Sequence, residues 1–378
     1  MAERETMTGR GPSEDPSAPL PPPRVGGESV EPEEIHFDER PVIGSSEPLA
    51  VSGLRDGPPV FGAGSVSAGT PRNRVRIGDR VFHGFAAGSG AFVVILIALI
   101  AVFLVVKAAP AIADDKSNFL FSRDWSVDGA TLQFGVVDLL WVTVIISLLA
   151  MVIAVPIAVG IALFITQYAP KRVAQPVAYI VDLLAAVPSI VYGIWGIAVL
   201  APRLEPVQRA LYHLGAFTLF EDKNVEQGTI FNGGIVLAVM ILPIVTAISR
   251  DVFARTPHEN IEAAWALGAT RWEMVRLAVL PYGRPGVISG AMLGLGRALG
   301  ETIAVTLILS KSGVGSPFTF SIFNGGETFA SKIANNAAEF NQPKQTGAFI
   351  AAGLVLFVLT FAVNAAARSV VSRRKEFV

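Results

Sequence analysis

The chain lacks cysteine entirely and carries few charges for its length. None of its 378 residues is cysteine, which excludes a disulfide framework, a thiolate nucleophile and cysteine-ligated zinc or iron–sulfur sites. Charged residues make up only 16% of the sequence, against roughly 25% in soluble proteins. The net charge of −1 gives no indication of a nucleic-acid partner. Together these features exclude an ordinary soluble protein.

Residues for catalysis and for metal or nucleotide binding are also missing. No G-x-x-x-x-G-K-[ST] phosphate loop occurs, so the chain is not expected to hydrolyse ATP. An intramembrane enzyme would need a nucleophile–base pair or a metal constellation, and neither is evident. The sequence therefore predicts a protein that is not an enzyme and binds no cofactor itself. The four histidines are scattered and suggest no metal site: His36, His83, His213 and His258.

Apolar residues, by contrast, are abundant and gathered in long runs. They make up 52% of the sequence, and the mean hydropathy is +0.53. A helix that crosses the hydrocarbon core needs about 20 such residues. We therefore expect an all-α integral membrane protein whose transmembrane domain covers residues 84–370. Its six transmembrane helices are predicted at about 84–106, 139–165, 177–200, 229–249, 286–310 and 347–367.

Residues 1–83 have a different composition. They hold 12 of the 25 prolines and 11 of the 36 glycines, and no long apolar run. Such a segment cannot bury enough apolar surface to offset its ordering entropy, so we expect a disordered N-terminal tail. It does not resemble a secretory signal, because it lacks the adjacent apolar core. A solvated linker and a regulatory docking segment both fit this composition.

The distribution of Lys and Arg predicts the orientation of the spans. With the N-terminus inside, the inner segments hold fifteen of these residues and the outer segments nine. Cytoplasmic segments carry such an excess. The basic C-terminus, 371–378, shows it most clearly. We therefore expect a multi-pass protein of the cytoplasmic membrane, surrounded by lipid, with both termini in the cytoplasm.

The sequence of the predicted cytoplasmic loop 250–285 predicts two short helices. Thr256–Glu259 reads as a capping box, Gly268 as a helix stop and Thr270–Glu273 as a second capping box. Pro281 is expected to end the second helix. The apolar and aromatic side chains between these signals favour either a protein partner or an amphipathic loop lying flat on the membrane.

The same loop resembles the EAA loop of ABC-importer permeases, which reads EAA-x3-G-x9-I-x-L-P. The chain departs from that pattern at Ala278, where isoleucine is usual. The resemblance implies a coupling helix that docks on a cytoplasmic ATPase. The residues that carry it are Glu262, Ala263, Ala264, Gly268, Leu280 and Pro281.

The fifth predicted span contains two charges, Arg297 and Glu301. Charges at mid-span are costly and mark function or pairing. Four residues apart on a continuous helix, the two side chains would share one face and could pair. One interpretation is a structural ion pair that locks helices together. The other is a gated anion site in which the arginine fork binds a tetrahedral oxyanion and Glu301 accepts a proton from phosphate.

Glycine spacing in the fifth predicted span and a proline in the third give further indications of helix packing and of a binding site. Gly290 and Gly294, and again Gly296 and Gly300, have the small-xxx-small spacing that lets another helix approach. In the third predicted span, Ser189 and Tyr192 follow Pro188. A broken helix there could offer donors to an anion, although helix packing explains them equally well. Asp182 reads either as a carboxylate at the membrane interface or as part of a pathway.

Three further segments resemble the permeases of phosphate importers, the PstC and PstA pair, and PstC in particular. They are Leu293–Thr302 (LGLGRALGET), Pro188–Gly196 and Ala330–Asn335, within a resemblance that runs over about residues 90–370. The resemblance implies the type I ABC-importer permease fold. It also implies that Arg297 and Glu301 take part in transport.

The same resemblance implies an assembly and a substrate. The partners would be a PstA-like sister permease, a dimer of an ATPase subunit that binds ATP with Mg, and an extracytoplasmic phosphate-binding protein. The substrate would be inorganic phosphate. An importer of another oxyanion, such as sulfate or molybdate, is the alternative within this class. An ion-coupled secondary transporter is the alternative outside it, but would leave the EAA loop unexplained.

Overall fold

The computed structural model describes residues 77–127, 132–213, 228–310, 320–340 and 343–372. Most of the predicted tail and the C-terminal residues 373–378 therefore lie outside the described residues. The predicted tail boundary at residue 83 is wrong, because residues 77–83 already belong to the first helix. Residues 77–83 contain no proline, so the helix can extend beyond the apolar run.

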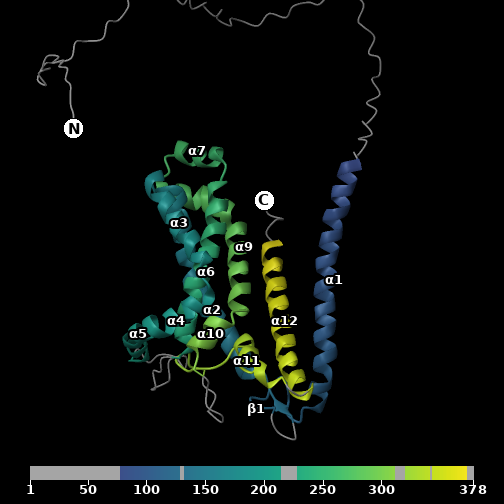
Figure 1. The fold of residues 1–378 in the computed structure, drawn as a ribbon. Helices are drawn as coiled ribbons and strands as arrows, with labels where there is room; N and C mark the ends of the chain where they lie inside the picture. The colour runs from purple at the N-terminus through teal and green to yellow at the C-terminus, as the bar shows by residue number, and fades with distance from the viewer. Residues whose placement is uncertain (1–76, 128–131, 214–227, 311–319, 341–342, 373–378) are drawn as a thin grey trace, which may run out of the picture. The chain divides into compact units, whose positions relative to one another are not determined.

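The described residues are almost entirely helical (Figure 1). One antiparallel pair of two-residue strands, β1 (Trp125–Ser126) and β2 (Gln133–Phe134), is the exception. The helices are α1 (Ile77–Asp114), α2 (Val137–Leu163) with the π turn η1 (Phe164–Tyr168), α3 (Lys171–Ala186), α4 (Ser189–Trp195) with the π turn η2 (Gly196–Leu200), α5 (Ala201–His213), α6 (Ile230–Ala254), α7 (His258–Ala266), α8 (Arg271–Met274) with the π turn η4 (Val275–Val279), α9 (Leu280–Leu299), α10 (Ile303–Ile308), α11 (Phe329–Asn335), the 3₁₀ turn η5 (Ala337–Glu339) and α12 (Pro343–Ser372).

Five helical segments of the described chain are long and apolar enough to cross a membrane, one fewer than predicted. Those beginning at Arg80, Val137 and Pro343 each contain a predicted span, and the one beginning at Ile230 contains all but the first residue of the predicted span 229–249. The predicted span 177–200 is not one helix. Val187 and Pro188 are extended and separate α3 from the apolar segment Ser189–His213, because a residue before proline is disfavoured in the α region.

The predicted span 286–310 is interrupted as well. Its helix α9 ends at Leu299, Gly300 follows as the C-terminal cap, and α10 begins only at Ile303. The Glu301 N–H bonds the Ala298 carbonyl three residues back, which tightens the last turn. Glycine is a poor helix former, so Gly300 offers a natural point for the break.

The centre of the bundle is formed by α2, α6 and α9. Residues of α2 and α6 make up most of the largest buried cluster, together with α10. Glycines of α9 allow close packing on α6: a Cβ at Gly286 would lie 2.3 Å from Val252, and one at Gly290 3.2 Å from Ile248. The predicted helix approach at Gly290 and Gly294 is confirmed. At Gly296 no atom of this chain lies within 4 Å of the Cβ position, so the helix approach predicted there stays a prediction.

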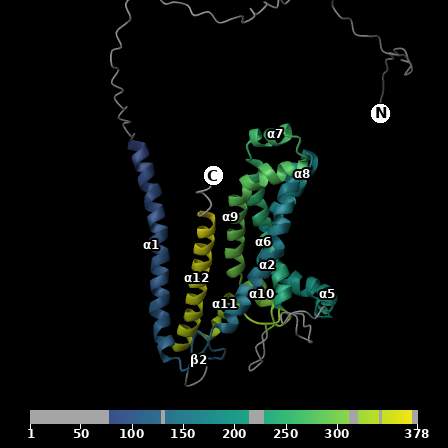
Figure 2. The same cartoon turned by 180° about the vertical axis from the view of Figure 1, so that it is seen from behind.

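Apart from this central group, α1 and α12 pack against each other as an antiparallel pair of helices and lie side by side in both views (Figures 1 and 2). Lys344 and Asp114 form an ion pair of 2.8 Å where α1 ends and α12 begins. Next to it, an aromatic cluster joins α12 to the strand pair, and Ala108 and Ala111 of α1 pack against it: Trp125, Phe134, Phe340 and Phe349. The start of α1, the end of α12 and the α7–α8 segment consequently lie at the same end of the bundle.

Candidate functional site

The segment between α6 and α9 contains the EAA residues and folds as α7, a turn and α8. Gly268 has a φ of 78°, a conformation that L residues with side chains rarely adopt. Its N–H donates to the Trp265 carbonyl at 2.9 Å, which closes the end of α7. The helix stop predicted at Gly268 is therefore confirmed, and it sets the angle between the two short helices.

Only one of the two predicted capping boxes forms. α7 begins after Pro257 without a side-chain cap, and the Thr256 hydroxyl instead donates to the Phe253 carbonyl at 2.9 Å. At α8, the Thr270 backbone N–H and hydroxyl donate to the Glu273 carboxylate at 2.8 and 2.7 Å. These two hydrogen bonds, the backbone one foremost, hold the pKa of the Glu273 carboxyl below its usual value. The carboxylate half of this capping box is therefore formed at neutral pH and is weakened as the pH falls through that lowered pKa, whereas the Glu273 N–H still donates to the Thr270 hydroxyl.

The prediction that Pro281 ends the second short helix is wrong. α8, η4 and α9 follow one another without an interruption, and Pro281 lies in the first turn of α9. In η4 the Leu280 N–H bonds the Val275 carbonyl five residues back, which inserts an extra residue just before the proline. The part of the EAA segment from Arg271 on is consequently joined by continuous helix to α9, which carries Arg297.

The segment from α7 through η4, His258–Val279, which we call the α7–α8 segment, presents large exposed apolar side chains. These are Trp265, Leu267, Trp272 and Leu277, which are 53%, 87%, 57% and 65% exposed. Of the EAA residues, Glu262 and Ala263 are exposed, whereas Ala264 is buried against a cluster that includes Phe253 and Val275. Leu280 is half-buried and Pro281 exposed. The segment is thus anchored from beneath and apolar on its outer side, as a docking surface requires.

Arg297 and Glu301 do not pair, which corrects the expectation of a shared helical face. Because α9 ends at Leu299, the two side chains lie on opposite sides of the helix break, and no ion pair joins them in the described structure. The Glu301 side chain is nearly buried, and its carboxylate accepts the Ala304 N–H at the start of α10 at 3.4 Å. Arg297 is exposed on the surface of this single chain.

The break in α9–α10 lies beside the break that follows α3. Across the α4–α10 contact, a Cβ at Gly193 would lie 3.0 Å from the Ala304 Cα, so the two short helices pack almost backbone to backbone. Tyr192 is buried, and its hydroxyl donates to the Leu184 carbonyl at 2.8 Å. Arg297 lies two residues before the end of α9, on the other side of the α9–α10 break from α10.

Ser189 begins α4 and is half-buried. The two adjacent breaks thus carry three of the four predicted pathway residues: Tyr192 in α4, Glu301 just before α10 and Arg297 near the end of α9. The fourth, Ser189, lies one turn from Tyr192 along the same short helix. Sequence periodicity could not reveal this arrangement, because it treated both spans as continuous. Within the described chain, no three His, Asp or Glu side chains gather as metal ligands.

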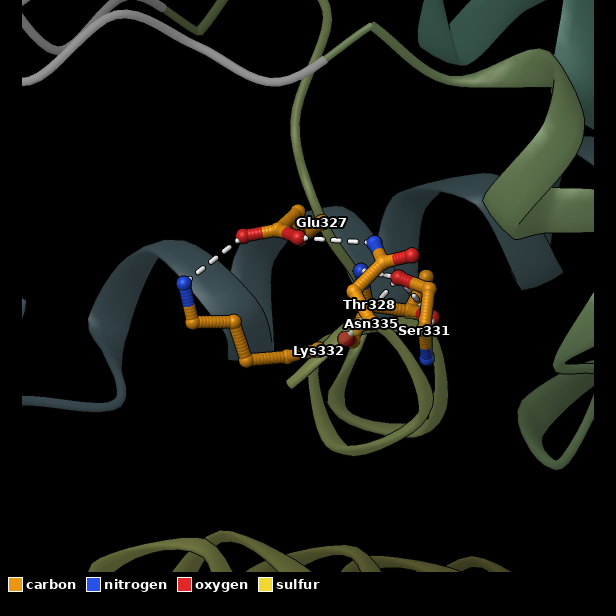
Figure 3. A network of polar contacts seen from close by, with 5 residues as sticks. All are labelled: Glu327, Thr328, Ser331, Lys332 and Asn335. Carbon is orange, nitrogen blue, oxygen red and sulfur yellow. Dashed lines mark hydrogen bonds and ion pairs between the residues drawn. The ribbon is translucent and has the colours of Figure 1, made fainter. Parts of the chain in front are cut away.

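A polar network at α11 was not anticipated (Figure 3). The Glu327 carboxylate accepts from Lys332 Nζ at 2.9 Å and from Asn335 Nδ2 at 3.0 Å. Thr328 and Ser331 form a capping box at the start of the helix. The sequence contains a sign of this network, because Glu327 precedes Lys332 by five residues and Asn335 by eight. Ala330–Asn335 was singled out from the sequence only for its resemblance to phosphate-importer permeases. The network fixes α11 against β1, where Lys332 also lies 5.3 Å from the Trp125 ring centroid.

Two polar side-chain contacts to α6, a hydrogen bond and an ion pair, were also not predicted from the sequence. Gln208 of α5 donates to Asn232 of α6, with both side chains almost completely buried. Arg250 of α6 lies 3.5 Å from the Asp182 carboxylate of α3. Neither pair has a sequence signature, because the partners are far apart along the chain.

Comparison with known proteins assigns the family. Residues 154–376 match the family described as "Binding-protein-dependent transport system inner membrane component". The chain is 57% identical to "Phosphate transport system permease protein PstC 2" of Mycobacterium tuberculosis, over 78% of this chain and 92% of that protein. The PstC of Mesorhizobium japonicum is 37% identical over 79% and 92%. The chain belongs to the PstC family of permeases.

Membership in the PstC family confirms the fold class predicted from the sequence, an integral membrane protein of helices with an importer permease fold. As a PstC-family member, the chain is a multi-pass membrane component of a binding-protein-dependent transport system. Such a system includes an ATPase and a substrate-binding protein. Among solved structures, the inward-facing methionine ABC transporter MetNI aligns at 16% identity with a TM-score of 0.47, over 63% of this chain and 95% of that one.

Proposed function

We propose that the chain is the permease subunit of an ATP-driven importer and forms part of the path of inorganic phosphate across the cytoplasmic membrane. The observation that carries this proposal is the high identity to mycobacterial PstC 2 along nearly the whole length of that protein. ATP, with Mg, binds to a separate ATPase dimer, and the permease itself holds no cofactor.

The exposed apolar side chains of the segment from α7 to η4 support the docking of that ATPase. Buried residues pack this segment against the rest of the bundle, while four large apolar side chains stay exposed: Trp265, Leu267, Trp272 and Leu277. Lipid would cover such side chains only if the segment lay flat on the membrane. The start of α1 and the end of α12 lie at this same end of the bundle. This arrangement agrees with a topology in which both termini and the ATPase-docking segment face the cytoplasm. A PstA-like sister permease and an extracytoplasmic phosphate-binding protein complete the assembly.

The pathway runs past the paired helix breaks. Arg297 has no carboxylate partner in the described structure, so its planar donors remain available to a tetrahedral oxyanion. Glu301 is close in sequence and nearly buried, and it accepts a proton from a protonated phosphate species. Tyr192 and Ser189 line the adjacent break. Sulfate carries no such proton near neutral pH, so this pair of residues favours phosphate.

Reconstitution tests the proposal. The chain would be co-expressed with its sister permease, ATPase and binding protein, inserted into proteoliposomes and supplied with radiolabelled phosphate. Uptake is expected only with ATP at the ATPase side, and excess sulfate or molybdate should not compete. Uptake driven by an ion gradient without ATP would contradict the proposal, as would a preference for sulfate or molybdate.

A further inference from the structure

α3 is a short helix between two breaks in the helical backbone. Ala169 and Pro170 precede it with ψ angles of 136° and 151°, and Val187 and Pro188 follow it with 129° and 141°. All four residues are extended, so helical hydrogen bonding stops at both ends of α3. A change of backbone angle at these breaks would move the helix as a unit, which is how hinged elements move.

Apolar packing holds α3 only weakly to the bundle. Val181 is the single fully buried residue among its sixteen. Tyr179, Ile180 and Leu183 are 70%, 58% and 68% exposed on the face away from α6. An element with so few buried contacts can shift at low free-energy cost.

Two polar contacts therefore set the position of α3. Its Asp182 carboxylate lies 3.5 Å from a guanidinium nitrogen of Arg250, and its Leu184 carbonyl accepts the Tyr192 hydroxyl at 2.8 Å. The first contact reaches α6 and the second reaches α4, across the break at Pro188. Arg250 stands four residues before the end of α6, where the α7–α8 segment begins.

We infer that Asp182 and Arg250 are positioning residues that transmit movement of the α7–α8 segment to the helix break beside Tyr192 and Arg297. A shift at the end of α6 carries Arg250 with it, the ion pair pulls α3, and the Leu184–Tyr192 hydrogen bond passes the displacement to α4. The inference rests on the proposed function, since the ATPase supplies the movement. It adds a mechanical link that is separate from the continuous helix α8–α9.

The first test measures phosphate taken up per ATP hydrolysed in the assembled complex. Asp182→Asn and Arg250→Gln should each lower this ratio about threefold, the scale of a partly exposed ion pair, while ATP hydrolysis continues. In Asp182→Asn, Arg250 keeps Asp251 as a partner at 3.8 Å, so no cation is left unpaired. The exchanged pair Asp182→Arg with Arg250→Asp should restore the ratio. Arg123→Gln is the matched control, because it breaks the comparably exposed pair with Asp138 and should change nothing.

The second test does not depend on phosphate. Because the chain has no cysteine, spin labels can be placed at Tyr179→Cys on α3 and Val152→Cys on α2, both of which are exposed. The distance between the labels should be narrowly distributed in the parent and in the exchanged pair, and broad in Asp182→Asn. Single variants with an unchanged uptake ratio and an unchanged distance distribution would overturn the inference, as would failure of the exchanged pair to restore both. If the parent transports no phosphate, the proposed function fails, but the label distances still decide whether the pair restrains α3.

Discussion

Arg297 is an exposed cation in the last turn of α9, and no carboxylate in the described structure neutralises it. We predict that Arg297→Ala lowers phosphate uptake at least about tenfold, because a charge-assisted hydrogen bond to the substrate is lost. Arg297→Lys should restore uptake poorly, since a point charge cannot present the planar fork. Uptake by the reconstituted complex measures both effects.

The yield of assembled complex is the control for Arg297. Since Arg297 forms no ion pair with Glu301, its removal leaves no buried carboxylate unpaired, and assembly should proceed as in the parent. A structural ion pair would instead make both single variants misassemble and let Arg297→Leu with Glu301→Leu restore assembly and transport. Transport by that double variant would end the anion-site proposal.

Glu301 has a local structural role in addition to the proposed one. Its carboxylate accepts the Ala304 N–H near the start of α10, as a helix cap does. Glu301→Ala should therefore destabilise the permease by about 1 kcal/mol, measured as a lower midpoint of thermal unfolding in detergent. Glu301→Gln keeps an acceptor and should retain the stability while still losing uptake. Normal uptake by Glu301→Gln would count against proton transfer to this carboxylate.

At the scale of the element, the α7–α8 unit depends on the turn at Gly268. Gly268→Val should strain this turn by about 1–2 kcal/mol, because a β-branched residue does not tolerate a φ of 78°. ATPase retained in a pull-down should fall, while insertion into the membrane is unchanged. Gly268→Asn is the matched variant, since asparagine accepts this backbone conformation, and it should retain the ATPase. Full ATPase binding and transport by Gly268→Val would contradict docking through this segment.

The contact between α9 and α6 depends on glycine in a different way. A Cβ at Gly286 would lie 2.3 Å from Val252, so Gly286→Val should push the two helices apart and cost about 1–3 kcal/mol. The midpoint of thermal unfolding in detergent should drop accordingly. Gly160→Ala, at a position with nothing within 4 Å, should leave it unchanged or raise it. Equal midpoints for the parent and Gly286→Val would show that the helices can separate without penalty.

At the scale of the whole molecule, the structure makes the orientation in the membrane testable. Leu267, on the α7–α8 segment, and Phe121, at the opposite end of the bundle, are 87% and 77% exposed. Since the chain has no cysteine, Leu267→Cys and Phe121→Cys each introduce one label site. A membrane-impermeant thiol reagent added outside intact cells should label Phe121→Cys and spare Leu267→Cys until the cells are opened. The reverse pattern would invert the proposed topology.

Several features were predictable because the physics behind them is local. A run of about 20 apolar residues requires lipid wherever it occurs, and the helices around 84–106, 139–165, 229–249 and 347–367 follow from this alone. The turn at Gly268 and the cap at Thr270 follow from residue types at fixed offsets. The helix breaks at Pro188 and Gly300 were not predicted from the sequence, because each span was judged by its apolar content alone. Proline and glycine at these positions are residues that commonly interrupt helices.

By itself, the amino-acid sequence determined the class of protein, the extent of most membrane helices and the identity of the EAA segment. It did so because hydropathy, lysine and arginine content and short motifs act over a few turns of chain. Only the tertiary structure decided which charges are paired. Arg297 and Glu301, four residues apart, are separated by a helix break, whereas Asp182 and Arg250 meet although 68 positions separate them. Ion pairs depend on distances through space, and the packing of α3, α6 and α9 sets those distances.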